Sequence, residues 1–195
     1  FNTVTNQSRP FQIDGHIIGN DTPPFCIAEV GINHNGDLAM AKRMIDAAKA
    51  AGANAVKFQT FKAEEFCGDP GQTFTYHSQG KQVTESMLEM FSRYEFSPTS
   101  WREIKAYCAA AGITFFSTPQ NPGDLEMLLK IGVPALKIGS DDFTNLPLIR
   151  SYIETRLPLI LSCGMSDLAE VHQALEAAGW FDGYPVALML CTSQY

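Results

Sequence analysis

Six short apolar runs alternate with stretches of helical periodicity along this 195-residue chain. Most of the runs are apolar throughout, as are the strands of a parallel sheet whose two faces are both covered. A regular alternation of strands and helices indicates βαβ units. The predicted strands are FCIAEV (25–30), NAVKFQ (54–59), ITFFS (113–117), ALKIGS (135–140), LILSC (159–163) and VALMLC (186–191).

Capping residues mark the ends of the predicted helices. Asp37 is expected to cap a helix that Gly52 ends, and Ser97 with Pro98 to begin a helix that Gly112 ends. The connection over 62–83 is polar and is expected to be irregular. It leaves the carboxyl end of the second strand, so it could cover the carboxyl ends of the strands. Further helices are predicted over 84–96, from Asp124, over roughly 144–155 with Pro147 in the first turn, and from Asp167, which forms a capping box with Glu170.

Two architectures suit strands and helices in strict alternation, a doubly wound open sheet and a (β/α)₈ barrel. The GxGxxG fingerprint of the first is missing after the first strand, and polar residues follow every strand rather than one switch point. The segment QIDGHIIG (12–19) indicates a hairpin that could close the bottom of a barrel. We therefore predict an α/β fold, a (β/α)₈ TIM-type barrel present as about six βα units, with residues 1–195 as the N-terminal portion of a single catalytic barrel.

Charge and composition exclude several classes of protein. The formal net charge is -7 with scattered Lys and Arg, unlike the basic footprint of a nucleic-acid-binding protein. The chain has no run of 18 apolar residues, and its first residues lack the charged and apolar regions of a signal peptide. The five cysteines form no CxxC pair and indicate reduced thiols. We expect a cytoplasmic protein with neither nucleic acid nor membrane as a partner.

Two lysines lie near the ends of apolar strands. Lys57 and Gln59 are two residues apart and share one face of their strand, while Lys137 and Ser140 lie at a similar level two strands later. Burying an ammonium group is costly unless an anion meets it. Two amines with neighbouring hydroxyls indicate a site for a dianion such as phosphate. Either lysine alone could instead extend to solvent or pair with an acid.

The other strand ends also carry polar groups. Glu29 ends the first strand, and Asn33 and His34 follow it in the loop. Two alternatives remain open here, since Glu29 could be the structural partner of a lysine and His34 could simply cap a helix. The remaining strand-end groups are Thr118, Ser162, Ser166, Thr192, Ser193 and Tyr195.

An ordered set of short sequence motifs, here called tags, resembles those of the sialic acid synthases, that is, the N-acetylneuraminate synthases and their relatives. The resemblance covers about residue 11 to the last residue. Each tag alone is weakly specific, whereas the set in this order is highly specific. The tags are IAEVGINHNGD (27–37), VKFQT (56–60), FFSTP (115–119), LKIGSDDFTNLPLI (136–149), LSCGM (161–165) and CTSQY (191–195).

The resemblance implies a transferase that condenses phosphoenolpyruvate with N-acetylmannosamine or a related N-acyl amino sugar. The products are phosphate and a nine-carbon 2-keto acid of the sialic acid type. It also implies a homodimer in which an antifreeze-like C-terminal domain, absent from this chain, follows the barrel. A divalent metal, Mn²⁺ or Mg²⁺, is held in the family by two histidines of the last strands, so no metal ligand is assigned in this chain.

Matched positions carry the family roles onto this sequence. The residues implied to bind phosphoenolpyruvate are Lys57, Thr118, Lys137, Ser140, Ser162 and Ser193. The implied catalytic residues are Glu29, Lys57, Gln59 and Tyr195, and those implied to contact the substrate are Glu29, Asn33, His34, Gln59 and Tyr195. Two positions depart from the family pattern: Cys163 stands where Thr is usual, and Gln120 where an aromatic residue is usual.

Two rival readings stay open. One is a Schiff-base aldolase in which Lys57 or Lys137 is the nucleophile, which requires a desolvated and unpaired amine. The other is an inactive barrel fragment or binding module, whose open sheet edge and exposed apolar face would favour association. We expect the 195-residue chain by itself to be inactive, and the intact protein to be the enzyme.

Overall fold

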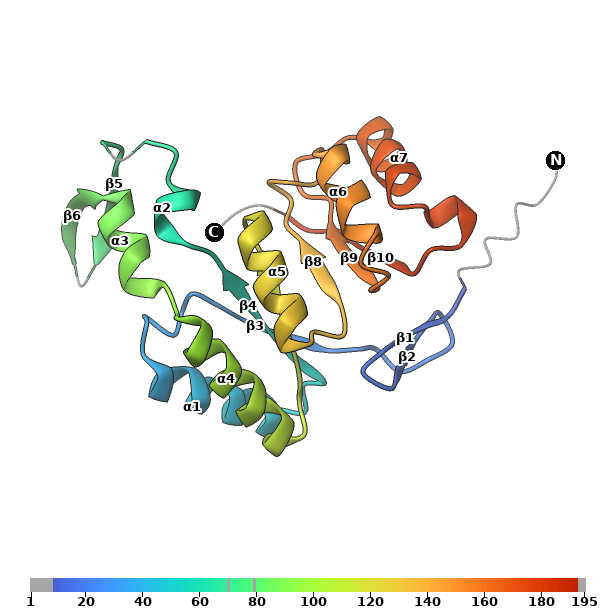
Figure 1. The fold of residues 1–195 in the computed structure, drawn as a ribbon, viewed down its shortest axis with the longest axis horizontal. Helices are drawn as coiled ribbons and strands as arrows, with labels where there is room; N and C mark the ends of the chain where they lie inside the picture. Colours follow the sequence, from blue (N-terminus) through green and yellow to red (C-terminus); the bar gives the residue numbers. More distant parts are fainter. Residues whose placement is uncertain (1–8, 70, 79, 193–195) are drawn as a thin grey trace. The chain divides into compact units, whose positions relative to one another are not determined.

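The chain packs into two compact units, which are coloured along the sequence in Figure 1. The structure is a computed structural model that describes residues 9–69, 71–78 and 80–192. Unit 2 spans Cys26–Val133, and unit 1 combines the described parts of Phe1–Phe25 and Pro134–Tyr195.

Unit 2 is built on three parallel strands in the order β3 (Ile27–Gly31), β4 (Ala55–Thr60) and β7 (Thr114–Pro119). Helices α1 (Leu38–Ala50) and α4 (Pro98–Ala111) pack against one another, and α5 (Pro122–Ile131) follows β7. The large side chains of the core are fully buried because the strands are apolar on the face that meets these helices; they include Phe58, Phe115, Trp101 and Ile104.

Unit 1 repeats this plan with the parallel strands β8 (Leu136–Ile138), β9 (Leu159–Ser162) and β10 (Val186–Met189). Helices α6 (Leu146–Ile153) and α7 (Leu168–Ala177) pack together, and the 3₁₀ helix η1 (Trp180–Asp182) follows α7. The antiparallel hairpin β1 (Phe11–Ile13) and β2 (His16–Ile18) also belongs to this unit, which confirms the hairpin predicted over 12–19.

The strand order within each unit is that of successive βα units. In each unit, strands that follow one another in the parallel series are hydrogen-bonded neighbours. A (β/α)₈ barrel has this order throughout, and each half of a doubly wound sheet has it too, because the reversal of such a sheet lies between its halves. All six predicted parallel strands are present in the described residues, with ends shifted by up to two residues. The prediction of an α/β fold made of (β/α)₈-type units is confirmed.

The predicted caps of three helices are also confirmed. The Asp37 carboxylate accepts the N–H of Ala39 at 2.8 Å and begins α1. Ser97 accepts an N–H in the first turn of α4. Asp167 and Glu170 form a reciprocal capping box at the start of α7, with both N–H···O distances at 2.9 Å. Side-chain oxygens satisfy N–H groups that have no partner within the helix.

The predicted start of α5 is wrong by two residues. The helix begins at Pro122 after the N-cap Asn121, and Asp124 lies inside its first turn. A proline in the first helical position has its φ already set for the helix, and its missing N–H would have had no partner there. The Asp124 carboxylate accepts the Asn121 N–H at 3.0 Å. Burial raises the pKa of Asp124 to about 6.

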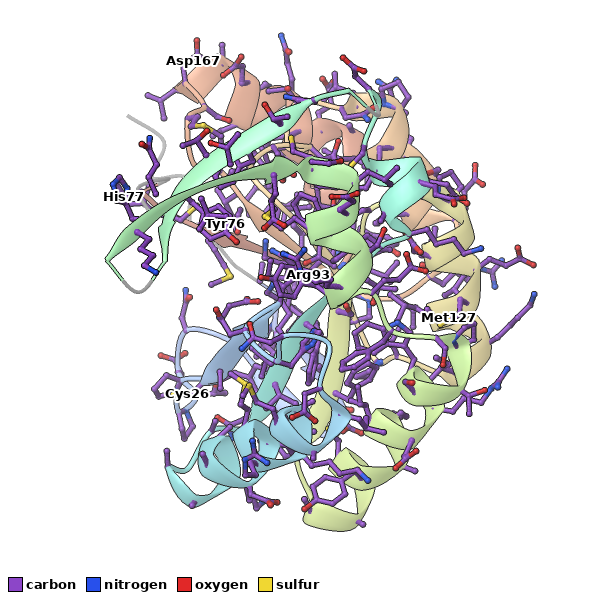
Figure 2. The ribbon with its side chains drawn as sticks, turned by 90° about the vertical axis from the view of Figure 1, so that its left-hand side faces the viewer. Cys26, Tyr76, His77, Arg93, Met127 and Asp167 are labelled. Carbon is purple, nitrogen blue, oxygen red and sulfur yellow. The ribbon has the colours of Figure 1, made fainter. Side chains whose placement is uncertain are left out.

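The connection predicted to be irregular over 62–83 contains regular structure. It holds α2 (Ala63–Phe66) and an antiparallel hairpin, β5 (Thr73–Ser78) with β6 (Lys81–Ser86). Helix α3 (Met87–Tyr94) begins after Ser86, later than predicted, because the preceding residues pair in β6. Glu85 holds the hairpin to α3. Its carboxylate accepts hydrogen bonds from the two terminal nitrogens of the Arg93 guanidinium, each at 2.7 Å, and from the Tyr76 hydroxyl at 2.6 Å. Tyr76 and Arg93 are labelled in Figure 2.

Candidate functional site

Polar side chains gather at the carboxyl end of the unit 2 sheet. Glu29 pairs in register with Lys57 of β4, and Gln59 with Thr118 of β7. Lys57 and Gln59 are two residues apart, so their side chains leave the same face of the sheet. We call the four residues Glu29, Lys57, Gln59 and Thr118 the Glu29 cluster.

An ion pair defines the Glu29 cluster. The buried Lys57 amine lies 2.6 Å from a Glu29 carboxylate oxygen and donates to the Thr118 hydroxyl at 3.3 Å. The Glu29 side chain is 50% exposed, so its carboxylate also faces solvent. The alternative in which Glu29 partners a lysine is therefore the arrangement observed. A Schiff-base lysine needs an unpaired, neutral amine, and the ion pair argues against that role for Lys57.

His34 lies in the aromatic core of unit 2, away from this cluster. Its ring stacks on Phe96 with centroids 4.2 Å apart and is tilted against Phe58 at 6.0 Å. The Gly36 N–H donates to Nδ1 at 3.1 Å, so the neutral ring carries its proton on Nε2. Nε2 is buried with no hydrogen-bond partner among the described residues. The position gives no support to the prediction that His34 contacts substrate.

We expect His34 to make unit 2 sensitive to acid. Burial lowers its pKa from 6.5 to about 4. Between these values the unfolded chain binds a proton that the folded chain does not, so stability is complete above pH 6.5 and is lost as the pH falls toward 4. The loss amounts to about 3 kcal/mol. Urea unfolding at a series of pH values measures how much the free energy of unfolding falls between pH 6.5 and 4. The fall should be smaller in His34→Phe than in the wild type, and it should equal the wild-type fall in the control His77→Gln, whose histidine is exposed. An equal fall in the wild type and both variants would contradict this prediction.

A second set of polar groups lies at the carboxyl end of the unit 1 sheet. Lys137 pairs in register with Ile160, and Ser162 lies two residues beyond Ile160, so Lys137 and Ser162 share a face. Ser140 follows β8, and its hydroxyl oxygen accepts the Gly164 N–H at 3.0 Å. The buried Lys137 amine donates to the Ile138 carbonyl at 2.7 Å.

A cysteine that the sequence reasoning did not select completes this second set. The Cys191 sulfur lies 3.1 Å from the Ser140 hydroxyl oxygen. A hydrogen bond from Ser140 is the largest cause that lowers the pKa of Cys191, and the positive charge of Lys137 adds to it. We call Lys137, Ser140, Ser162, Gly164 and Cys191 the Ser140 cluster. An ammonium and two hydroxyls are groups that bind a phosphate-like anion, and the Gly164 N–H holds the Ser140 hydroxyl in place.

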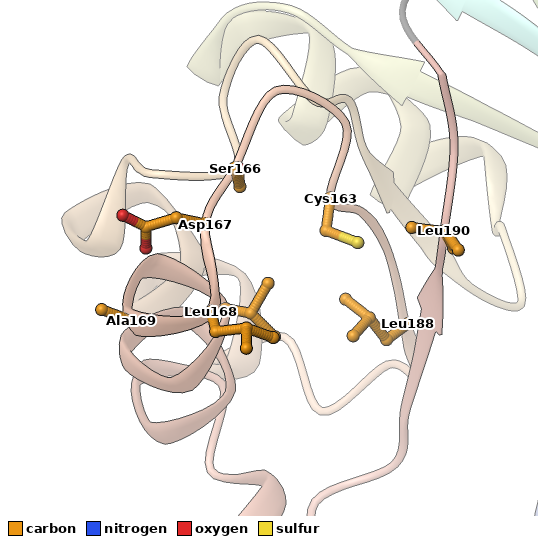
Figure 3. A pocket seen from close by; sticks show the side chains of 8 residues that line it. Cys163, Ser166, Asp167, Leu168, Ala169, Leu188 and Leu190 are labelled. Carbon is orange, nitrogen blue, oxygen red and sulfur yellow. The ribbon is translucent and has the colours of Figure 1, made fainter.

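A cavity of about 790 Å³ lies on the opposite face of the unit 1 sheet. Lys137 and Ala187 both pair with Ile160, and Leu188, the next residue along β10, points to the other side. The labelled leucines in Figure 3 face this space between β10 and α7. Its lining is mostly apolar: Cys163, Ser166, Asp167, Leu168, Ala169, Val171, Leu188 and Leu190.

This cavity is part of an apolar surface beside a sheet edge. Leu168 is 87% exposed and Leu190 is 91% exposed, and both line the cavity. Two such exposed leucines at one place form an apolar patch on the surface. Strand β10 has a strand partner on one side only within the described residues. In a (β/α)₈ barrel such a face is covered by the neighbouring βα unit. The apolar lining of the cavity is therefore explained as a surface on which a neighbouring βα unit packs. The lining contains none of the residues predicted for the site.

Several of the predictions for the site are not tested by these two clusters. Lys57 and Lys137 belong to different units, so their binding of one shared anion stays a prediction. Asn33 is exposed in the loop that follows β3. Ser193 and Tyr195 lie outside the described residues, and their predicted roles stay untested.

Two kinds of feature are absent from the part of the chain that the structure describes. No three His, Cys, Asp or Glu side chains come together there in a way that could hold a metal ion. The ligands of a divalent metal were predicted outside this chain, and that prediction stays untested. None of the helices in the described ranges is both long and apolar enough to cross a membrane.

Comparison with known proteins identifies relatives of one kind. The sequence model of the NeuB family matches residues 44–195. The N,N'-diacetyllegionaminic acid synthase of Legionella pneumophila is 36% identical over 181 residues, which are 91% of this chain and 51% of that protein. The human N-acetylneuraminate-9-phosphate synthase is 33% identical over 93% of this chain and 50% of its own length.

A solved structure agrees with these sequence matches. The N-acetylneuraminic acid (sialic acid) synthetase from Leptospira borgpetersenii, crystallised in complex with citrate, superposes with a TM-score of 0.83 at 33% identity. The match covers 96% of this chain and 60% of that chain. This chain thus spans about half the length of the curated relatives it matches.

Proposed function

Because this chain belongs to the NeuB family, we propose that the protein carrying it condenses phosphoenolpyruvate with an N-acyl amino sugar. The products are a nine-carbon 2-keto acid of the sialic acid type and inorganic phosphate, and N-acetylmannosamine or a close relative is the acceptor. The observation that carries this proposal is the Ser140 cluster, in which the buried Lys137 amine lies among hydroxyls and an N–H at a sheet end. Both the relatives' names and this geometry support an anionic substrate.

The Ser140 cluster would hold the phosphate of phosphoenolpyruvate. Lys137 supplies a positive charge, and Ser140 and Ser162 supply directional donors. Lys57 and Thr118 of the Glu29 cluster are proposed to contact the same phosphate, as a barrel that brings all its strand ends to one face would allow. Ser193 is proposed as a further ligand. Fixing the dianion in this way positions the enol for reaction.

The Glu29 cluster would serve the reacting carbon. The enol carbon of phosphoenolpyruvate attacks the aldehyde of the open-chain sugar, and positive charge develops at the carbon that bears the phosphate. The Glu29 carboxylate stabilises this charge and takes a proton from the water that adds there. Phosphate then leaves with cleavage of the C–O bond. Gln59 and Tyr195 are proposed to contact the sugar, with Asn33 and His34 in the neighbouring loop.

Three finer features belong to the same proposal. The intact protein is proposed to act as a homodimer in the cytoplasm. A divalent cation, Mn²⁺ or Mg²⁺, is proposed to polarise the aldehyde oxygen, with ligands outside the described residues. Cys163 and Gln120, which depart from the family pattern, are proposed to influence the choice of sugar.

A phosphate-release assay on the whole protein tests the proposal. Phosphoenolpyruvate is supplied with N-acetylmannosamine, its 6-phosphate, or diacetamido hexoses, and with no sugar as the control. Release that requires one of these sugars, together with ¹⁸O transfer from the bridging position of phosphoenolpyruvate into phosphate, is the expected result. Sugar-independent release, or retention of that label in the keto acid, would refute the chemistry. Borohydride trapping of a lysine adduct would instead indicate a Schiff-base aldolase.

A further inference from the structure

The contact between Cys191 and Ser140 limits what the Ser140 hydroxyl can do. That oxygen already accepts the Gly164 N–H at 3.0 Å, and the Cys191 sulfur lies 3.1 Å away. A serine hydroxyl has one proton and two lone pairs. When Cys191 carries its proton, the S–H can donate to the second lone pair, and the Ser140 proton stays available for an anion.

The opposite holds when Cys191 is a thiolate. A thiolate has no proton to donate, so the 3.1 Å contact can be a hydrogen bond only if Ser140 donates to sulfur. Ser140 then has no proton left for an anion oxygen. The negative sulfur also repels an incoming dianion across a short distance. Protonation of Cys191 and binding of an anion at Ser140 are therefore coupled.

We propose that Cys191 is a positioning residue of the anion site, whose thiol form orients the Ser140 hydroxyl toward a bound phosphate group. This inference rests on the proposed function, because it assigns the Ser140 cluster to the phosphate of phosphoenolpyruvate. Reciprocity requires that a bound phosphate favours the protonated thiol as much as the thiol favours phosphate.

The surroundings of the thiol support a titration in an accessible range of pH. Its pKa is lowered first by the Ser140 hydrogen bond, then by the Gly164 N–H, by Ser162 and by the charge of Lys137. No carboxylate of the described residues is among the groups that shift it. The neighbouring Cys163 thiol faces the Met189 carbonyl instead, at 3.4 Å. By contrast, burial raises the pKa of Cys108 to about 12.

Calorimetric titration of the whole protein with inorganic phosphate between pH 7.5 and 9.5 tests the coupling. Above the thiol pKa the wild-type dissociation constant should rise about tenfold per pH unit, because one proton is taken up with each anion. Cys191→Ser keeps a donor that does not titrate in this range, so its affinity should stay nearly constant. Cys191→Ala should also lose the pH dependence. A wild-type slope that persists in Cys191→Ser would overturn the proposal, since Lys137 or phosphate would then be the titrating group.

Alkylation gives a second and independent readout. The rate at which iodoacetamide modifies Cys191, followed by mass spectrometry of its peptide, reports the thiol pKa. Saturating phosphate should raise that pKa in the wild type and raise it less in Ser140→Ala, where only the charge repulsion between thiolate and phosphate remains. An unchanged pKa in the wild type would overturn the role of Cys191 while phosphate still binds. Failure of the wild type to bind phosphate at any pH would instead overturn the proposed function, and this inference with it.

Discussion

Lys137→Met is expected to raise the KM for phosphoenolpyruvate about 10- to 150-fold and to leave the KM for the amino sugar nearly unchanged. Lys137 is buried at the end of the unit 1 sheet, on the face that it shares with Ser162, and its amine donates to the Ile138 carbonyl. The proposed dianion would be a further partner of this amine. Hydrogen bonds to charged groups stabilise by about 1.5–3 kcal/mol, which corresponds to this range of binding constants. Met has nearly the same length and packs in the same space without the charge.

The matched control for this variant is Lys130→Met. Lys130 lies on α5 with its side chain 73% exposed and pairs with Glu126 one helical turn away at 2.7 Å. Losing such an exposed pair should leave both KM values unchanged. Initial rates over a grid of both substrate concentrations give the two constants. Equal increases in both KM values in Lys137→Met would mean that the lysine does not belong to the phosphate site.

Glu29→Gln is expected to lower kcat about 100-fold or more without raising the KM for phosphoenolpyruvate. The amide keeps the size of the side chain, but it can neither offset positive charge on the reacting carbon nor accept a proton from water. General acid–base groups contribute about 10²- to 10⁴-fold to the rate. Because the variant also leaves the Lys57 amine without its carboxylate partner, binding of an anion should not weaken.

Glu103→Gln supplies a closely matched control. Glu103 also accepts a lysine amine at 2.6 Å, from Lys42, and its side chain is 49% exposed, against 50% for Glu29. The two substitutions therefore break ion pairs with the same N···O distance and the same exposure of the carboxylate, although Lys57 is more buried than Lys42, and only Glu29 is at a strand end. A similar fall in kcat in both variants, or a fall in thermal stability that accounts for the loss in Glu29→Gln, would make the Glu29–Lys57 pair purely structural.

The architecture could be predicted from the sequence because its signals are local. The six apolar runs and the caps at Asp37, Ser97 and Asp167 depend on neighbours within a few residues, and the structure has them where they were expected. The hairpin β5–β6 was missed because its strands are largely exposed and polar, and the alternation of Phe74 and Tyr76 with polar residues in β5 is not continued in β6. Its aromatic positions and the Gly80 turn were the available signals.

The contacts of individual side chains near the strand ends were harder to predict than the positions of the strand ends. The lysines were selected because an ammonium in an apolar strand is costly, a rule that needs no coordinates. The burial of His34 could not be predicted, because polar residues surround it in the sequence and its stacking on Phe96 is a contact across the fold. Cys191 escaped notice for the same reason: its partner Ser140 is 51 residues earlier in the chain.

The salt link between Glu29 and Lys57 has a consequence for the timing of a turnover. The carboxylate is half exposed, so solvent screens the link on the side of Glu29, while Lys57 is buried. On the proposed function, an arriving phosphoenolpyruvate would take over the amine and free the carboxylate at the same moment. The Glu29 carboxylate would then stay paired with Lys57 in the absence of substrate, and it would become free to act as a base only when phosphoenolpyruvate is bound.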